Sequence, residues 1–424
     1  MKKHIALVLL LVAAMLLGSI GSVGLAETQS TNVVIWAFAD PHARYFEYIA
    51  EKYTELHPDV TFTVELMDLT ALNDRLAIVI GGGGEGSPDL VDIEQGSFSR
   101  YMSQDMMHFV PLNGYLENDG LMDDVVIARL NLYAYDGSYY GLEHALCPVL
   151  MAYRPDLFEQ YNLEVPATWE QYVAAARVFK ENGIYITAES DLSNGITGIF
   201  NEMSIAMGED FIRNSNGGFE ITDGWKWWAE EYKALQRDGH VYLFEDTSDK
   251  YGAIAENIVA TDFIADWAAG WLRDNVPEQS GMWRLAPLPL MNENSAPVSV
   301  NGGTGLCMVE YSQVPQDTLW DFMKFAMLDA GNLVTKYEMT SLYPPVYSAM
   351  EACNTPVEYY GGQNLGELWQ SLADQTPVQY QSRVRAYFAD LTKTEFYDWM
   401  EGSVTIDELA DLLTEKVESY LAAE

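Results

Sequence analysis

Residues 136–170 read DGSYYGLEHALCPVLMAYRPDLFEQYNLEVPATWE, and this stretch decides the fold of the chain. It opens with an Asp-Gly turn signal, and the run from Tyr139 to Tyr153 predicts an extended segment. That run carries Glu143, His144 and Cys147 among apolar residues. Polar groups in the middle of an apolar strand predict that the strand crosses between two bodies or lines a cleft.

The second half of the stretch predicts two helices. Asp156 to Tyr161 has the composition of a short helix, and a longer amphipathic helix begins after Thr168. Thr168 and Gln171 have the spacing of a capping box, in which each side chain bonds the other residue's backbone amide. A polar strand followed by two helices is therefore the central unit from which the rest of the chain is interpreted.

The first hundred residues alternate strands and helices. Apolar β-type runs occur at Thr31–Ala37, Val60–Leu66 and Asp89–Ile93, and helical spacing occurs at 42–57 and 71–80. This order is typical of a doubly wound α/β sheet. A length of 424 residues is sufficient for two such units, and we expect an α/β fold with two lobes.

The N-terminus has the pattern of a signal peptide over residues 1–26. Lys2 and Lys3 precede an apolar core from Ile5 to Leu17, and Gly24-Leu25-Ala26 resembles a cleavage site. The alternative is an uncleaved N-terminal anchor. No Cys lies near the cleavage point, so no lipid anchor is expected. These features predict an extracytoplasmic protein, located in a periplasm or associated with the cell surface.

Charge and cysteine content exclude several classes of partner. The net charge is −40, and removal of residues 1–26 takes away two Lys and no acid, leaving −42. Such a field excludes nucleic acid and anionic membrane as partners. Cys147, Cys307 and Cys353 form an odd set, so at least one thiol is free, and a Cys147–Cys353 pair is left open. No metal-binding or cofactor motif is present, so we expect neither group.

Aromatic residues near strand ends indicate a binding site. The chain has 26 Tyr and 11 Trp, and aromatic planes stack on the apolar faces of sugar rings while polar side chains bind the hydroxyl rims. Ligands of open α/β sheets lie outside the carboxyl ends of strands. The candidates by this rule are Trp36, Asp40, Glu94 and Gln95, with core packing or solvated turns as the alternatives. Glu143 and His144 are candidates on the predicted crossing, with a buried structural pair as the alternative.

The central stretch also resembles a known family. The pattern of turn, strand, short helix and Pro-x-Thr-Trp is similar to the family 1 extracellular solute-binding proteins of ABC importers, the group that includes maltose-binding protein. The resemblance covers nearly all of the chain after residue 26 and is weakest at 184–255 and 352–400. The matching residues are Asp136, Gly137, Tyr140, Gly141, Leu142, Tyr153, Asp156, Leu157, Phe158, Leu163, Pro166, Thr168, Trp169 and Glu170.

The resemblance implies a hinged architecture. Lobe one would comprise residues 27–143 plus 291–335, and lobe two 148–286 plus 340–424. The crossings would lie near 142–148, 286–291 and 333–343. A monomer would capture a carbohydrate between the lobes and deliver it, by hinge closure, to the membrane permease subunits of an ABC transporter.

The resemblance adds further candidate site residues. Trp267 matches a position where a Trp commonly stacks on sugar, and Asp266 precedes it, whereas Trp271 is expected in the core. Asn301, Gly302 and Gly303 match a loop whose backbone approaches the ligand, with a plain tight turn as the alternative. Two more candidates come from their positions in the chain: Tyr343, at the last crossing, and Arg383, on a late helix, for which a surface ion pair is the alternative.

Two other functions stay open at the level of the sequence. A binding protein of the same fold could take a non-sugar solute such as a polyamine, which the negative charge would suit. A secreted glycoside hydrolase is the second alternative, but 63 Asp and Glu make any carboxylate pair uninformative, and no catalytic motif is present. We therefore expect a binding protein that is not an enzyme.

Overall fold

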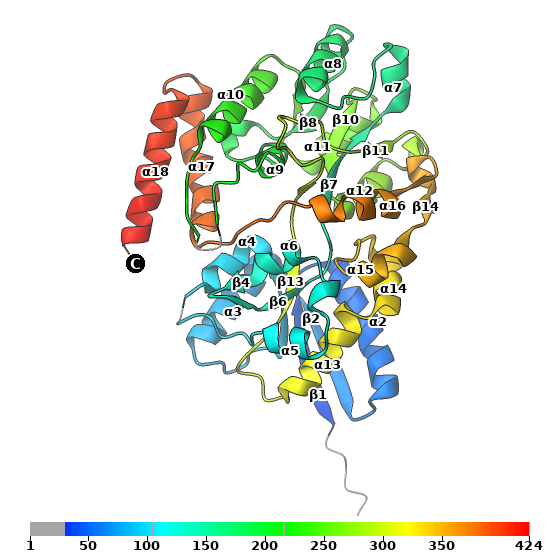
Figure 1. Ribbon diagram of the computed structural model, residues 1–424, viewed down its shortest axis with the longest axis vertical. Coiled ribbons are helices and arrows are strands. Elements are labelled where there is room, and N and C mark those ends of the chain that lie inside the picture. The colour runs from blue at the N-terminus through cyan, green and yellow to red at the C-terminus, as the bar shows by residue number, and fades with distance from the viewer. Residues whose placement is uncertain (1–29, 104, 215–216, 424) are drawn as a thin grey trace, which may run out of the picture.

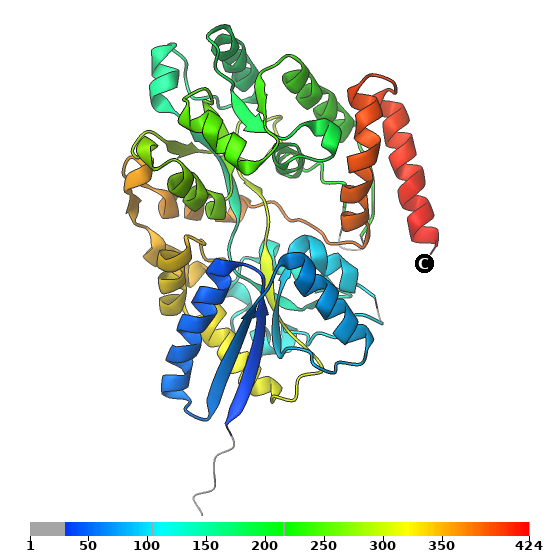
Figure 2. The ribbon, with the colours of Figure 1, turned by 180° about the vertical axis from the view of Figure 1, so that it is seen from behind.

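The computed structural model describes residues 30–103, 105–214 and 217–423, which form two lobes (Figure 1). The predicted signal peptide, residues 1–26, lies outside the described residues. Seen from behind, strands β1 and β2 and helix α2 lie in the lower lobe, and the green helices lie in the upper lobe (Figure 2). No helix within the described ranges has the length and apolar character needed to cross a membrane.

Lobe one is built on a five-stranded sheet in the order β2-β1-β3-β13-β6. The first three strands are parallel, and β13 runs antiparallel to both β3 and β6. The predicted strand–helix alternation of the first hundred residues is confirmed. The strands are β1 (Thr31–Ala37), β2 (Val60–Leu66), β3 (Leu90–Glu94), β6 (Gly141–Glu143) and β13 (Thr304–Met308), and the helices include α2 (Asp40–Leu56), α3 (Leu69–Gly81), α4 (Gln95–Phe98), α5 (Asn113–Asn118), α6 (Ile127–Leu130) and α13 (Gln316–Met327).

Lobe two has a smaller antiparallel sheet centred on β7, which pairs with β10, β11 and β12. Its core is rich in aromatic side chains, and Trp225, Trp228 and Tyr232 are buried on one face of α10. The strands are β7 (Pro148–Tyr153), β8 (Thr187–Glu189), β9 (Val241–Leu243), β10 (Thr261–Ile264), β11 (Arg284–Ala286) and β12 (Ser299–Val300), and the helices include α7 (Pro155–Gln160), α8 (Trp169–Glu181), α9 (Gly198–Ala206), α10 (Asp223–Arg237), α11 (Thr247–Ala255), α12 (Asp266–Asn275), α16 (Leu365–Leu372), α17 (Val384–Met400) and α18 (Ile406–Ala422).

The chain passes between the lobes at three places. The first passage, residues 144–147, joins β6 of the first sheet to β7 of the second. The second passage is at 301–303, between β12 and β13, and not near 286–291 as the resemblance implied. The difference arises because β12 pairs with β7, which keeps residues 284–300 in lobe two instead of lobe one. The third passage contains α14 (Ala330–Thr340) and α15 (Tyr347–Met350), which contribute side chains to the cores of both lobes.

All three cysteines are buried and free. The pair Cys147–Cys353 that was left open is therefore not a disulfide in this structure. Cys147 lies on the first passage with a positive φ of 52°, and its carbonyl accepts a hydrogen bond from the Asn301 amide at 3.2 Å. The first and second passages thus lie side by side and are joined through their backbones.

Candidate functional site

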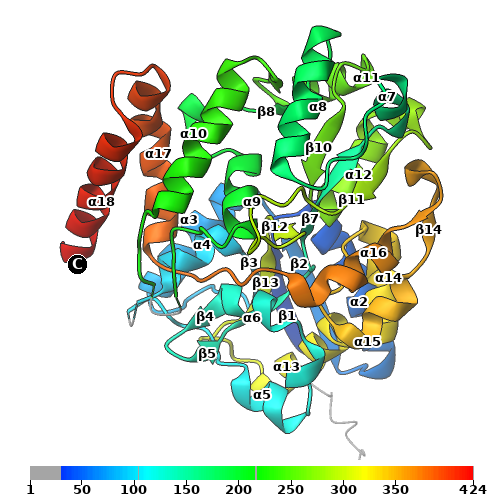
Figure 3. The same cartoon turned by 45° about the horizontal axis from the view of Figure 1, so that its top comes forward.

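A cavity of about 440 Å³ lies between the lobes, and we call it the central cavity. Lobe one contributes the end of β3 and helix α4, and lobe two contributes α9 and α17. Helix α4 contacts α17 directly, and both face the region of α9 (Figure 3). The polar residues that line the central cavity include Glu94, Gln95, Ser97, Arg100, Thr197, Asn201, Asn301, Gln379, Arg385, Asp390 and Lys393.

A smaller hollow of about 180 Å³, the side pocket, adjoins the central cavity and shares Gly198 and Asn301 with it. Its walls carry five aromatic side chains from β10, α11, α12 and the segment before α11: Phe244, Tyr251, Phe263, Trp267 and Trp271. Its charged residues are Glu189, Glu202 and Lys250. The two hollows together combine an aromatic compartment with a polar one.

Glu94 and Gln95 lie where the strand-end rule predicted, in the wall of the central cavity. The Glu94 carboxylate caps α4 by accepting a hydrogen bond from the Ser97 amide at 3.0 Å. Burial raises the pKa of Glu94. Gln95 donates its backbone amide to the Gly303 carbonyl at 3.0 Å, while its side-chain oxygen is buried without a partner among the described residues.

Trp267 lies in the wall of the side pocket and is held there by the second passage. Its indole Nε1 donates to the Asn301 carbonyl at 3.0 Å, and a Cβ added at Gly302 would lie only 3.3 Å from that nitrogen. Trp271 stands edge-on to it, with ring centroids 5.0 Å apart. The expectation that Trp271 belongs to the core is wrong: it is 52% exposed, because its turn of α12 borders the pocket.

Asp266 and Tyr343 lie outside both cavities and bond to each other. The Asp266 carboxylate accepts from the Tyr343 amide at 3.0 Å and from the Trp267 amide at 2.8 Å, and burial raises its pKa to about 7. The Tyr343 hydroxyl donates to the Gly366 carbonyl at 3.0 Å. These two residues therefore tie the third passage to the N-terminus of α12, immediately behind Trp267.

Glu143, Gly302 and Gly303 form a buried joint between the first two passages. Arg129 Nη2 donates to the Glu143 carboxylate and to the Gly302 carbonyl, each at 2.9 Å. The other Glu143 oxygen accepts from the Thr304 amide at 2.7 Å. Gly303 has a φ of 150°, and a Cβ there would lie 2.5 Å from both the Arg129 and Glu143 side chains, so only glycine fits.

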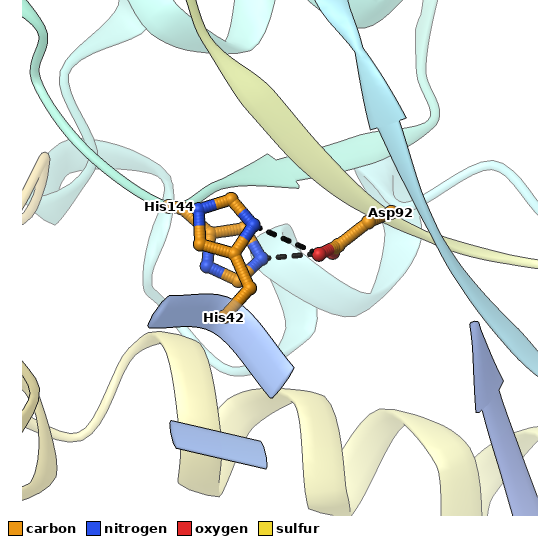
Figure 4. Close-up of side chains that lie close together, drawn as sticks. All are labelled: His42, Asp92 and His144. Atoms are coloured by element: carbon orange, nitrogen blue, oxygen red, sulfur yellow. Dashed lines mark hydrogen bonds and ion pairs between the residues drawn. The ribbon is translucent and has the colours of Figure 1, made fainter. Parts of the chain in front are cut away.

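His144 belongs to a buried cluster with Asp92 and His42, shown in Figure 4. His144 Nε2 and His42 Nδ1 each lie 2.9 Å from a different oxygen of Asp92, and the two rings are stacked 3.9 Å apart at 8°. Burial lowers the pKa of His144 to about 3, so the neutral ring donates its proton to the carboxylate. Each ring bonds one oxygen of the Asp92 carboxylate, and we interpret the cluster as a hydrogen-bonded support for the first passage.

Three other candidates lie away from both cavities. Trp36 is buried inside lobe one with the Arg75 guanidinium 4.0 Å above its ring. Asp40 is exposed at the start of α2 and pairs with Arg44 at 2.8 Å. Arg383 lines a third hollow at the edge of the interlobe region, together with Tyr135 and Phe219. The structure therefore brings Glu94, Gln95, Trp267 and Asn301 to the cavities.

Several lining residues were not predicted. Thr197, Asn201 and Glu202 belong to α9 or its cap, and Gln379, Arg385 and Asp390 lie on or before α17. They fall within 184–255 and 352–400, where the family pattern is weakest. The one signal available was the pairing of polar residues with short apolar pieces near Asn201, which alone does not distinguish a site from a loop.

Comparisons with known proteins agree with this geometry. The sequence profile of the family described as bacterial extracellular solute-binding protein matches residues 39–332. An arabinooligosaccharide-binding protein of Halalkalibacterium halodurans is 25% identical over 328 residues, which cover 70% of this chain and 68% of that protein. A lactose-binding protein of Rhizobium radiobacter is 24% identical over 361 residues, covering 81% of each chain.

Solved structures of similar fold include the sugar-binding protein MalE of Xanthomonas citri. It superposes with a TM-score of 0.78 at 16% identity, covering 93% of this chain and 98% of that one. A binding protein associated with an ABC transporter of B. animalis subsp. lactis, in complex with beta-1,6-galactobiose, gives a TM-score of 0.71 at 19% identity, with coverage of 92% and 97%. The match to the family profile extends over more than half of the sequence. The chain belongs to the bacterial extracellular solute-binding protein family.

Proposed function

We propose that this protein is the extracytoplasmic binding component of an ABC importer and that it captures a carbohydrate, an oligosaccharide, in the cleft between its lobes. The observation that carries the proposal is the side pocket, where Trp267 and Trp271 stand beside Glu202 and Asn301. Aromatic faces stack on the apolar faces of sugar rings, and carboxyl and amide groups bind their hydroxyl rims. The names of the arabinooligosaccharide- and lactose-binding relatives support the same class of ligand.

The arrangement of the two hollows favours a ligand of more than one ring. One ring would stack on Trp267 in the side pocket, and the next would extend past Asn301 into the central cavity. There Glu94 and Gln95 of lobe one face Asn201 and Arg385 of lobe two. A saccharide that contacts both lobes would favour the closed arrangement of the hinge, because only that arrangement lets both sets of groups bind it.

The closed form would be the one that membrane permease subunits recognise. Residues 1–26 would direct export, and the mature chain would act as a monomer without a cofactor. We propose lobe one as residues 31–143 plus 304–329 and lobe two as 148–300 plus 351–423, with the three passages as the hinge. No reaction is required of the site, since capture and release need only reversible binding.

The first prediction is binding of a neutral oligosaccharide by residues 27–424. A thermal-shift screen against arabino-oligosaccharides, lactose, galactobiose and maltodextrins should find one class that raises the melting temperature. A ligand at 100 times its Kd adds about 2.7 kcal/mol to the free energy of unfolding. If no saccharide raises the melting temperature and a polyamine does, the carbohydrate proposal is rejected, while the assignment of the fold is unaffected.

The second prediction separates the site from the scaffold. Trp267→Ala should weaken binding by about tenfold or more in calorimetry, because the stacking plane is lost. Trp267→Phe should recover much of it, since a phenyl ring still stacks. The control is Trp227→Ala, an exposed Trp on α10 outside both cavities. Equal affinity of all three variants would place the ligand elsewhere.

A further inference from the structure

Glu202 is a buried acid with one unused oxygen. It lies on α9, is 2% exposed and lines the side pocket. Its Oε1 accepts a hydrogen bond from Asn301 Nδ2 at 2.5 Å. Its Oε2 is buried without any partner among the described residues. An unpaired carboxyl oxygen beside a cavity costs stability unless a ligand or a proton satisfies it.

The side pocket that Glu202 lines holds one cation, Lys250, but Lys250 forms its ion pair with another acid. Glu189 on β8 is the nearest acid: a Cβ placed on Gly198 would lie 3.3 Å from Glu189 Oε2 and 3.7 Å from Glu202 Oε1. Lys250 on α11 is the cation of the pocket, but its ammonium pairs with Asp262 on β10 at 2.9 Å. Tyr251 on α11 is the remaining titratable group of the pocket wall. Because Glu189 and Glu202 lie close together and Lys250 pairs with Asp262, ionisation of both glutamates at once is disfavoured.

Glu189 is the less suitable of the two acids to hold the proton, although burial raises its pKa as well. Its two oxygens accept backbone hydrogen bonds from Ser190 at 3.0 Å and from Ile199 at 2.8 Å, and both bonds stabilise the ionised form. Among the described residues, the Glu202 carboxylate accepts from the Asn301 side chain and from no backbone amide. Burial, followed by the charge of Glu189, raises the pKa of Glu202 to about 8. The proton therefore resides on Glu202 at neutral pH.

We propose that Glu202 binds the ligand as an uncharged carboxylic acid, whose Oε2 donates its proton in a hydrogen bond to an oxygen of a neutral sugar unit stacked on Trp267. This inference rests on the proposed function and names the charge state of the ligand. A carboxylic acid has one oxygen that accepts and one that donates, and the contacts have this division: Oε1 accepts from Asn301, and Oε2 is unused beside the pocket.

The test is the pH dependence of affinity, measured by calorimetry with the neutral saccharide found in the screen. The wild-type Kd should be constant from pH 6 to 7 and should rise about tenfold per pH unit above pH 8, as the donor is lost. Glu202→Gln should bind within a few-fold of the wild type at pH 6 and stay constant to pH 9. The amide would accept from Asn301 with its oxygen and donate to the sugar with its nitrogen.

Two further variants complete the experiment. Glu202→Leu should lose about tenfold or more in affinity at every pH, because neither hydrogen bond remains. Glu170→Gln, an exposed acid at the start of α8, should behave like the wild type. Thermal unfolding of each variant checks that it is folded, and if the Leu variant does not fold, the comparison of Gln with the wild type decides.

Three results would overturn the proposal. A wild-type Kd that does not change between pH 6 and 9 would mean that Glu202 does not donate. Affinity that rises with pH and is lost in Glu202→Gln would identify an ionised carboxylate, and amine-bearing saccharides or polyamines should then bind more tightly. Failure of every saccharide with every variant at every pH would reject the proposed function together with this inference, whereas pH-independent saccharide binding rejects the inference alone.

Discussion

At the scale of a single residue, Lys336 is a buried lysine beside the three passages, and its charge lowers the stability of the folded chain. Its side chain on α14 is 1% exposed, and its ammonium lies 3.7 Å from the Met327 sulfur and 5.2 Å from the centre of the Tyr45 ring. Burial lowers its pKa to about 7, although Asp92 and Glu143 oppose the shift. A lysine in this position destabilises the folded chain whenever it is charged.

The sign of its effect on stability follows from proton binding. Below pH 7 Lys336 is charged in both the folded and the unfolded chain, but in the folded chain the charge is buried away from water. Between the folded pKa of about 7 and the unfolded value of 10.5, the unfolded chain binds more protons, so stability rises with pH. Lys336→Met should therefore raise the melting temperature by a few degrees at pH 6, and the gain should shrink toward zero near pH 10. A gain of equal size at both pH values would contradict this explanation.

At the scale of elements, the Gly303 turn is the tightest point of the hinge. A Cβ there would meet the Arg129 and Glu143 side chains at 2.5 Å. Gly303→Ala should cost about 2 kcal/mol or more in urea unfolding, because the Arg129–Glu143 pair must move apart. Gly281→Ala is the matched control: its φ is also positive, at 84°, but a Cβ there would meet nothing within 4 Å. Equal losses of stability in Gly303→Ala and Gly281→Ala would show that the strain of a positive φ explains the effect and that contact with the Arg129–Glu143 pair does not.

The elements also show what sequence patterns can and cannot predict. Helix α18 begins with a closed capping box formed by Thr405 and Glu408, a motif that sequence can predict because all of its residues lie within one turn. At α8 the Thr168 hydroxyl accepts from the Gln171 amide, but the Gln171 side chain bonds the Ala167 amide instead, so the box is not closed. The same residues also bond a segment far away in the sequence, since the Leu290 backbone exchanges hydrogen bonds with Ala167 and Trp169.

Short strands explain the misplaced second passage. β11 has three residues and β12 has two, which is too short for an alternating pattern, and only their pairing with β7 assigns them to lobe two. The long strands of lobe one were predictable, since each carries its own apolar run. In the site, Glu94 and Gln95 followed from the strand-end rule and Trp267 and Asn301 from the family pattern. Glu202 and Arg385 did not, because helices outside that pattern bring them to the cavities.

At the scale of the whole molecule, we propose that the three passages allow the lobes to move as units. The hydrophobic cores of lobe one and lobe two are separate clusters. Helices α14 and α15 and the α6 segment contribute side chains both to the core of lobe one and to a further cluster beside the three passages. A ligand that contacts Glu94 on one side and Arg385 on the other shifts the equilibrium toward closure by its difference in affinity for the two forms.

We expect X-ray scattering to detect this closure in solution. The radius of gyration of residues 27–424 should fall when the saccharide found in the screen is added to saturation. Trp267→Ala at the same ligand concentration should show a smaller change, because less of the protein is bound. Saturation of the wild type without any compaction would reject hinge closure as the response to the ligand.

The most direct measurement is the diffraction structure of the protein crystallised with that saccharide. We expect a sugar ring stacked on Trp267 in the side pocket, with a ring or hydroxyl oxygen within hydrogen-bond distance of Glu202 Oε2 and further units extending past Asn301 toward Glu94. Saccharide density outside the two cavities, with no ligand in either of them, would contradict the proposed binding site.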